Sequence, residues 1–126
     1  MKIAVASRDF LRVTGHAGKA RRWLIFEAGP GGAATRPKRV ELGLREVFHH
    51  ADGGTPHPLD GVAAVIAASC GGGFLRKMAR RGIAAAMTAE TEPAKAVAAF
   101  LEGRLPPPKP RPVMGILCKI RDRLSA

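Results

Sequence analysis

The sequence predicts an α/β fold built on a mixed sheet of about five strands. A continuously apolar run at residues 62–68 is typical of a strand that is covered on both faces. A helical segment, a second short apolar run and another helical segment follow it, the alternation that forms βαβ units with parallel strands. Glycine and proline at residues 29–32 mark a tight turn earlier in the chain, so part of the sheet is expected to be antiparallel.

The first half of the chain predicts three strands. Residues 3–6 are a short apolar run, and the first strand is expected to end at Ser7-Arg8-Asp9. Residues 23–28 form the second strand, which the turn at 29–32 terminates. Residues 36–44 mix charged and apolar side chains, as a strand at the edge of a sheet does. The second and third strands are therefore expected to pair as an antiparallel hairpin.

The second half predicts two strands alternating with two helices. After the strand at 62–68, a helix begins near Phe74 and ends at Gly82, a residue type common at helix C-termini. Residues 83–87 form the next strand, and Pro93 begins the last helix. The spacing of apolar residues predicts which side chains face the core in each helix. They are Phe74, Leu75, Met78 and Ala79 in the first, and Ala94, Val97, Ala98 and Leu101 in the second.

The proline-rich run after residue 105 predicts a boundary. Residues 1–105 form one domain, and residues 106–112 contain five prolines and read as an extended spacer. Beyond the spacer, residues 113–124 place apolar side chains on one face and Lys119, Arg121 and Arg123 on the other. The segment 106–126 is thus expected to be a spacer followed by a basic amphipathic helix, which docks on its own domain, a partner or an anionic surface.

The composition excludes several classes of protein. Two cysteines, at 70 and 118, cannot form a disulfide framework, and no apolar run is long enough to span a bilayer. We therefore expect a soluble protein of the cytoplasm. The 126-residue chain carries a net charge of +11, with the excess in residues 1–50 and 105–126. Such a balance attracts anions: nucleic acid, anionic lipid, phosphate or a negatively charged metal cluster.

Imidazole and thiol side chains next to glycine are the candidate metal ligands. His16 lies between Gly15 and Gly18, and the cations Lys19, Arg21 and Arg22 follow it. Cys70 follows a predicted strand and precedes a predicted helix, whose dipole would lower the pKa of its thiol. The backbone amides of Gly71, Gly72 and Gly73 would face an anion there.

A second group of histidines surrounds residues 51–56, which are rich in glycine. His49, His50 and His57 are weaker candidates as metal ligands, because their spacing matches no closed zinc motif. We expect a solvated loop that becomes ordered on binding and closes over the ligand.

Catalytic motifs are absent from the sequence, which predicts that the protein is not an enzyme. There is no phosphate-binding Walker loop, no dinucleotide-binding glycine pattern after a strand and no nucleophile elbow. Cys70 could pair with His16 or His57 as a nucleophile, but no third group that would orient such a pair is evident.

Several segments, taken in order, resemble the dinitrogenase iron-molybdenum cofactor biosynthesis family, which includes NifX, NafY and the C-terminal domain of NifB. They are Ile3-Ala4-Val5-Ala6-Ser7, Thr14-Gly15-His16-Ala17-Gly18-Lys19-Ala20, Trp23-Leu24-Ile25-Phe26, His49-His50, His57-Pro58-Leu59, Ala64-Val65-Ile66 running into Cys70-Gly71, Gly82-Ile83, and the stretch from Glu92-Pro93 to Leu105. The resemblance covers about residues 1–105. It implies a ribonuclease-H-like α/β/α fold whose five-stranded mixed sheet has its second strand antiparallel.

The resemblance also implies a non-enzymatic function in nitrogen fixation. Members bind an iron–sulfur cluster transiently, either the iron-molybdenum cofactor or its precursor, and pass it between nitrogenase cofactor assembly proteins. His16 matches the family's loop histidine, and Cys70 matches a cysteine of NifX-like members. The alternative is a basic nucleic-acid-binding or scaffold protein of the same fold without a cluster. One Trp and no Tyr leave little for base stacking, which disfavours nucleic acid.

Overall fold

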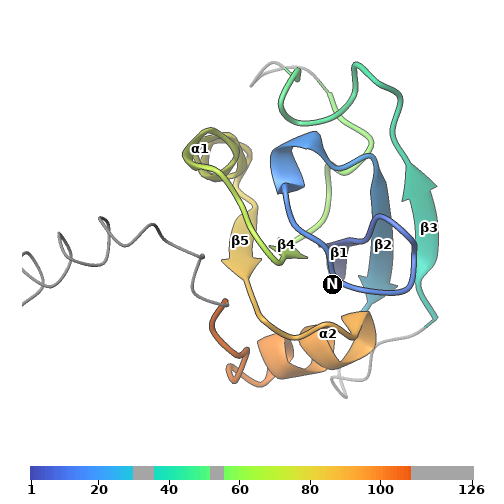
Figure 1. Ribbon diagram of the computed structural model, residues 1–126, viewed down its shortest axis with the longest axis vertical. Helices are drawn as coiled ribbons and strands as arrows, with labels where there is room; N and C mark the ends of the chain where they lie inside the picture. Colours follow the sequence, from blue (N-terminus) through green and yellow to red (C-terminus); the bar gives the residue numbers. More distant parts are fainter. Residues whose placement is uncertain (30–35, 52–55, 109–126) are drawn as a thin grey trace, which may run out of the picture.

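The computed structural model describes residues 1–29, 36–51 and 56–108. At its centre is a five-stranded sheet in the order β3-β2-β1-β4-β5 (Figure 1). The elements, in chain order, are β1 (Lys2–Ala6), the short 3-10 helix η1 (Ala17–Lys19), β2 (Arg22–Glu27), β3 (Lys38–Glu41), β4 (Ala64–Ala67), α1 (Gly72–Arg81), β5 (Ala84–Met87) and α2 (Pro93–Leu101).

The sheet is mixed, and its second strand alone opposes the others. β1 is parallel to β4, and β4 is parallel to β5. β2 is antiparallel to both of its neighbours: its Ile25 lies opposite Ala4 of β1, and its Trp23 lies opposite Val40 of β3. The predicted α/β class, the five strands and the antiparallel hairpin of the second and third strands are therefore confirmed. The third strand is shorter than its predicted range and lies at the edge, as its charged residues indicated.

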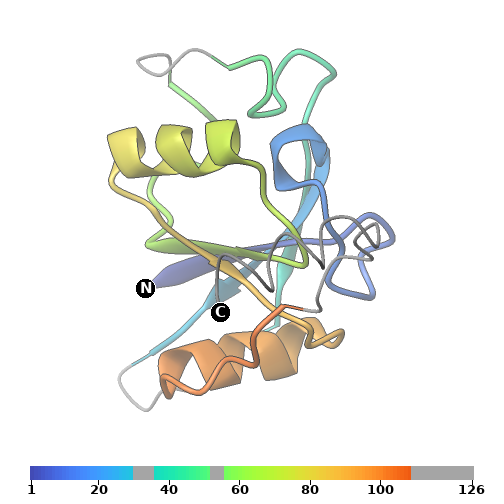
Figure 2. The ribbon, with the colours of Figure 1, turned by 60° about the vertical axis from the view of Figure 1, so that its left-hand side comes forward.

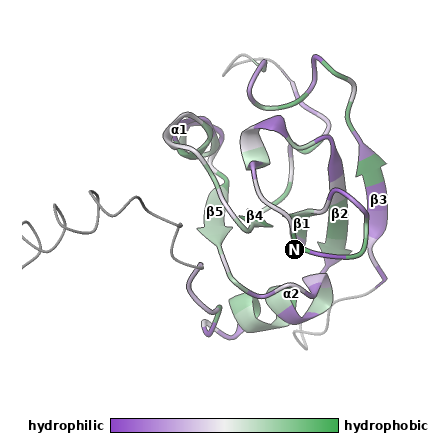
Figure 3. Ribbon diagram, viewed as in Figure 1, coloured by the Kyte–Doolittle hydropathy of each residue, from purple (hydrophilic) through white to green (hydrophobic). Residues whose placement is uncertain are grey.

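The two helices cover opposite faces of the sheet and make three layers (Figure 2). Alternate residues of the central strands divide between two cores because side chains alternate across a sheet. Ala4, Val65 and Ala67 face α1, whereas Ile3 and Ile66 face α2. All four residues of β4 are buried, as a strand covered on both faces must be. Hydrophilic residues are prominent on β3, whereas β4 and β5 are hydrophobic or neutral (Figure 3).

The inward face of α1 differs from the predicted one. Phe74 and Met78 are buried, but Leu75 is 38% exposed and Ala79 is exposed as well. The helix is rotated because it also contacts the connection between β3 and β4, through Lys77 and Arg81. Its end is as predicted: Gly82 has φ +72°, a conformation that glycine adopts without strain.

The inward face of α2 also differs in part. Pro93 stands in its first turn as predicted, and Val97 is buried, but Ala94 and Ala98 are exposed. Ala96 is the alanine that packs against the sheet, together with the half-buried Leu101. Alanines lie on both the inward and the outward face of this helix. The spacing of apolar residues in the sequence therefore could not identify the inward face.

The chain stays in contact with the domain beyond α2. Leu105 packs against the core on the α2 side, the Thr88 hydroxyl donates to the Pro106 carbonyl over 2.7 Å, and the Ala89 amide donates to the Pro107 carbonyl over 3.1 Å. The rest of the predicted spacer and the predicted basic helix at 113–124 lie outside the described residues. In the part of the chain that the structure describes, no helix is long and apolar enough to cross a membrane.

Candidate functional site

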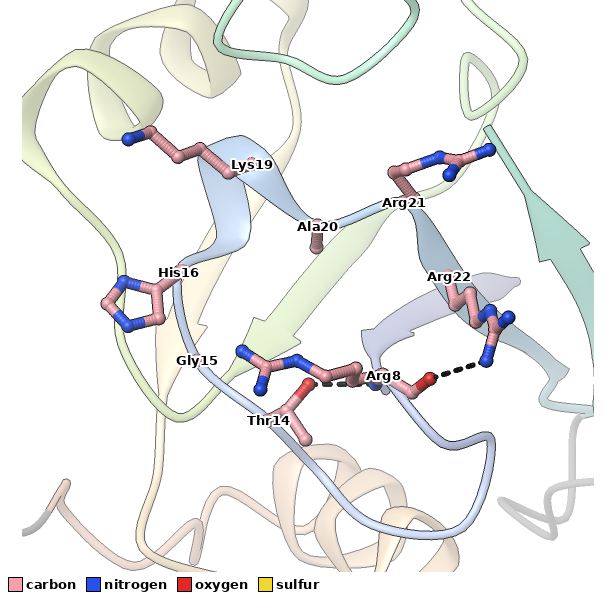
Figure 4. A pocket seen from close by; sticks show the side chains of 8 residues that line it. All are labelled: Arg8, Thr14, Gly15, His16, Lys19, Ala20, Arg21 and Arg22. Carbon is pink, nitrogen blue, oxygen red and sulfur yellow. Dashed lines mark hydrogen bonds between the residues drawn. The ribbon is translucent and has the colours of Figure 1, made fainter. Parts of the chain in front are cut away.

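The loop between β1 and η1 lies across the carboxyl ends of the two central parallel strands, where ligands bind in open α/β sheets. The Thr14 amide donates to Ala6 at the end of β1, and the Ala68 amide beyond β4 donates to Thr14, each over 2.9 Å. The Thr14 hydroxyl accepts from the Arg8 amide over 2.9 Å, as Figure 4 shows. These bonds hold the loop as a fixed extension of the sheet.

His16 is held at the end of this loop in a left-handed backbone conformation, with φ +55° and ψ +50°. That conformation costs a non-glycine residue on the order of 1 kcal/mol, so its neighbours must hold it there. Ser69 does so: its hydroxyl accepts from the His16 amide over 2.8 Å and its carbonyl accepts from the Ala17 amide over 3.1 Å. The His16 side chain is exposed.

Two grooves meet at His16. The first, about 440 Å³, is lined by cationic and polar residues and is called the arginine groove below. Its lining residues are Arg8, Thr14, Gly15, His16, Lys19, Ala20, Arg21 and Arg22 (Figure 4). The second, about 340 Å³, lies between η1 and the first turn of α1 and is called the helix groove. Its lining residues are His16, Gly18, Lys19, Phe48, His49, Gly71, Gly73, Phe74 and Lys77.

The cations of the arginine groove do not all face His16. Arg8 extends toward Gly15, on the side of His16, whereas Arg21 and Arg22 extend the other way, toward β3 (Figure 4). Both of the latter reach Glu41 on β3, at 3.4 and 3.6 Å. The negative charge of Glu41 offsets part of theirs. Arg8 and Lys19 are therefore the cations placed to act beside His16.

The helix groove adds the N-terminus of α1 to the site. Gly71 is the N-cap residue, and no side chain caps the first turn, which also contains no acidic residue. Backbone amides at a helix N-terminus carry partial positive charge and accept anions. Of the three predicted glycines, Gly71 and Gly73 line this groove. Among the described residues, no carboxylate lines either groove.

The connection between β3 and β4 forms the outer wall of the helix groove. The His49 amide donates to Gly18 over 2.6 Å, which ties this wall to the His16 loop. The Lys77 ammonium donates to the carbonyls of Phe48 and His49, over 2.6 and 3.1 Å, and ties it to α1. His50 is exposed and lines a different hollow, with Leu44 and Arg45.

His57 does not lie in a solvated loop, so that prediction is wrong. The residue is 8% exposed, and its ring stacks on that of Phe48 with 3.9 Å between ring centroids. Nε2 donates to the Glu46 carbonyl over 2.5 Å, and Nδ1 accepts from the Leu59 amide over 3.0 Å, so both ring nitrogens are engaged. Burial lowers the pKa of His57 from its ordinary value of 6.5. His57 therefore holds the connection between β3 and β4 in place from its buried side, through Phe48, Glu46 and Leu59.

Cys70 is half-buried against the core on the α1 side, and it lines neither of the two grooves. Burial raises the pKa of its thiol to about 11. The predicted lowering of this pKa is wrong: burial removes the thiol from water, disfavours its charged form and raises the pKa instead. The raised pKa favours the neutral thiol over the thiolate that binds metal.

The structure thus brings together part of the predicted set and adds to it. His16, Lys19, His49, Gly71 and Gly73 share one groove. Arg8 and Lys77 were not predicted as site residues; Arg8 could have been found from its position directly after the first strand. Within residues 1–29, 36–51 and 56–108, no three His, Cys, Asp or Glu side chains converge to hold a metal ion.

Fold and site together define a small α/β domain with two hollows that meet at an exposed histidine and are lined by basic residues. The chain belongs to the dinitrogenase iron-molybdenum cofactor family, whose model matches residues 1–103. This confirms the resemblance found in the sequence. A comparison with the curated proteins finds no match.

Two solved structures show the same fold. The crystal structure of PH0822 is 20% identical, with a TM-score of 0.65, and the match covers 83% of this chain and 92% of that one. The NMR structure of TM1290, a candidate NifB protein of the DUF35 family from Thermotoga, is 21% identical, with a TM-score of 0.54, and covers 89% and 98%.

Proposed function

We propose that this protein carries an anionic iron–sulfur cluster, of the iron-molybdenum cofactor or precursor type, between proteins of nitrogenase cofactor assembly in the cytoplasm. It binds the cluster reversibly through His16 and performs no chemistry on it. The family supports the type of ligand, since its model describes the dinitrogenase iron-molybdenum cofactor. The strand order, with only β2 antiparallel, supports a ribonuclease-H-like fold.

One observation carries the proposal: an exposed histidine is fixed where two carboxylate-free grooves meet. Imidazole binds iron as a neutral ligand, and the fixed backbone of His16 limits the ordering that binding requires. Arg8, Lys19 and the first-turn amides of α1 offset the negative charge of the cluster. A cluster that brings most of its own ligands needs few from the protein, and few bonds make release possible.

Nucleic acid fits this surface less well. Trp23 is fully buried, so the one indole of the chain cannot stack on a base.

The test is cluster binding by the full chain under anaerobic conditions. A thiolate-ligated [4Fe–4S] cluster is added to wild type, His16→Ala and Cys70→Ala, and bound iron is measured after gel filtration. We expect His16→Ala to weaken binding by about tenfold or more, the loss of roughly 1.4 kcal/mol. Cys70→Ala is expected to bind like wild type, because its thiol is protonated and outside both grooves.

Binding that neither substitution changes would refute the site. Steeply salt-dependent binding of DNA or RNA, with no cluster binding, would instead support the nucleic-acid alternative.

A further inference from the structure

We propose that His49, which lines the helix groove together with His16, is the second protein ligand of the cluster. This inference rests on the proposed function and makes it specific. The carrier would hold its cargo between two imidazoles from different parts of the chain, one on the loop after β1 and one on the connection between β3 and β4.

Both histidines line the same groove, although 32 intervening residues separate them in the sequence. Each has an exposed side chain. The short backbone bond from the His49 amide to the Gly18 carbonyl, 2.6 Å, joins the two segments two residues beyond His16. This bond fixes the separation of the two backbones, as a preformed two-ligand site requires.

The His49 backbone is also fixed from the opposite side. Lys77 projects from α1 and donates to the carbonyls of Phe48 and His49 at once. Phe48 itself is fully buried between His57, Trp23 and Phe74. His49 is thus anchored through its amide to Gly18 and through its carbonyl to the Lys77 side chain, and it follows a buried aromatic residue, so its backbone has little freedom.

The other candidates for a second ligand fit less well. His57 has both ring nitrogens engaged, and Cys70 carries a protonated thiol outside the grooves. His50 is adjacent to His49 and exposed, but it lines the hollow beside Leu44 and Arg45. The chain therefore offers a matched control for His49 at the next position.

The binding step is a ligand exchange. Each histidine donates an imidazole lone pair to a different iron of the cluster. Each of these two irons releases one thiolate, which takes a proton from water, so two imidazoles replace two thiolates. No electrons are transferred. The loss of two anionic ligands leaves a less negative cluster, and Lys19 and Lys77 line the groove where the remaining charge lies.

The experiment compares His49→Ala with His50→Ala in the full chain, using the thiolate-ligated [4Fe–4S] cluster as the probe. Both substitutions keep the backbone bonds of the segment, and both side chains are exposed, so both variants should fold. Affinity is measured by anaerobic titration, and pulsed EPR of the reduced cluster counts the histidine nitrogens coupled to it. We expect wild type and His50→Ala to show two such nitrogens.

His49→Ala is expected to show one coupled nitrogen and about tenfold weaker binding. A tenfold loss corresponds to roughly 1.4 kcal/mol of binding free energy, which we attribute to the lost ligand. His49→Cys should restore affinity with a thiolate in place of the imidazole. If His49→Ala retains two coupled nitrogens, or binds as His50→Ala does, His49 is not a ligand. In that case, a loss confined to His16→Ala would leave the carrier function standing, whereas no loss in any variant would overturn both proposals.

Discussion

At the scale of single residues, the site depends on a close contact that only glycine permits. A Cβ added to Gly15 would lie 2.4 Å from the Ser69 hydroxyl oxygen, the same oxygen that accepts from the His16 amide. Gly15 is therefore required by its neighbour and not by its own backbone conformation. The serine and the glycine form one unit that sets the position of His16.

We expect Gly15→Ala to lower the free energy of unfolding by about 1–3 kcal/mol, the usual cost of overpacking. Ser69→Ala should cost about 0.5–1.5 kcal/mol, because the His16 amide loses its acceptor. The double variant should be less destabilised than the sum, since the hydroxyl that clashes is gone. Urea unfolding of the four proteins measures this coupling; strictly additive costs would show that the contact is not the cause.

At this scale the sequence predicted the exposure of His16 correctly, but it did not predict the surroundings of the other candidate residues. Glycines on either side of His16 indicated an outward-facing histidine, and the structure places it at the junction of two grooves. The pKa of Cys70 could not be predicted, because a helix N-terminus is visible in sequence but burial is not. The direction of Arg21 and Arg22 depends in the same way on Glu41, a residue of another strand.

At the scale of elements, the connection between β3 and β4 determines whether the helix groove has an outer wall. His57 is the buried support of that connection, and it is neutral there. Its charged form would place a proton on Nδ1, where the Leu59 amide now donates. Glu46, Asp60 and Arg81 are the charged groups near its ring, and burial remains the largest influence on its pKa.

This arrangement predicts that acid destabilises the connection. The pKa of His57 is lower in the folded protein than its unfolded value of 6.5, so the unfolded chain binds the proton more readily. The stabilisation is complete above pH 6.5 and is lost as the pH falls from there toward the folded pKa. We expect the free energy of unfolding of wild type to fall between about pH 8 and about pH 5, and that of His57→Gln to change less. Equal slopes in the two proteins would contradict this prediction. Working above about pH 5 leaves Asp60 ionised in both.

The identity and order of the strands and helices were predicted more accurately than the faces that the helices turn toward the core. All five strands and both helices were predicted in their correct order, because runs of apolar residues and turn glycines determine the local conformation of the segments in which they occur. The inward faces of α1 and α2 were partly wrong, because Leu75, Ala94 and Ala98 are apolar residues at the surface. Contacts such as that of Lys77 with the Phe48 carbonyl decide the rotation of a helix, and they join residues distant in sequence.

At the scale of the whole molecule, the net charge of +11 acts on any anionic ligand before contact. Five basic residues and one acidic residue lie within 109–126, so a substantial part of that charge lies in the C-terminal segment, whatever its conformation. Long-range attraction accelerates association and is screened by salt, whereas direct contacts govern dissociation. The two effects can therefore be separated by kinetics.

We expect the triple variant Lys119→Gln, Arg121→Gln, Arg123→Gln to bind the thiolate-ligated [4Fe–4S] cluster several-fold more slowly than wild type at low ionic strength. The difference should vanish near 0.5 M salt, about where the Debye length falls below 5 Å, and the dissociation rate should not change. The matched control exchanges Lys and Arg at the same three positions and should behave as wild type. Stopped-flow absorbance measures both rates. A faster dissociation in the glutamine variant would mean that the segment contacts the bound cluster directly, and long-range attraction would no longer account for its basic residues.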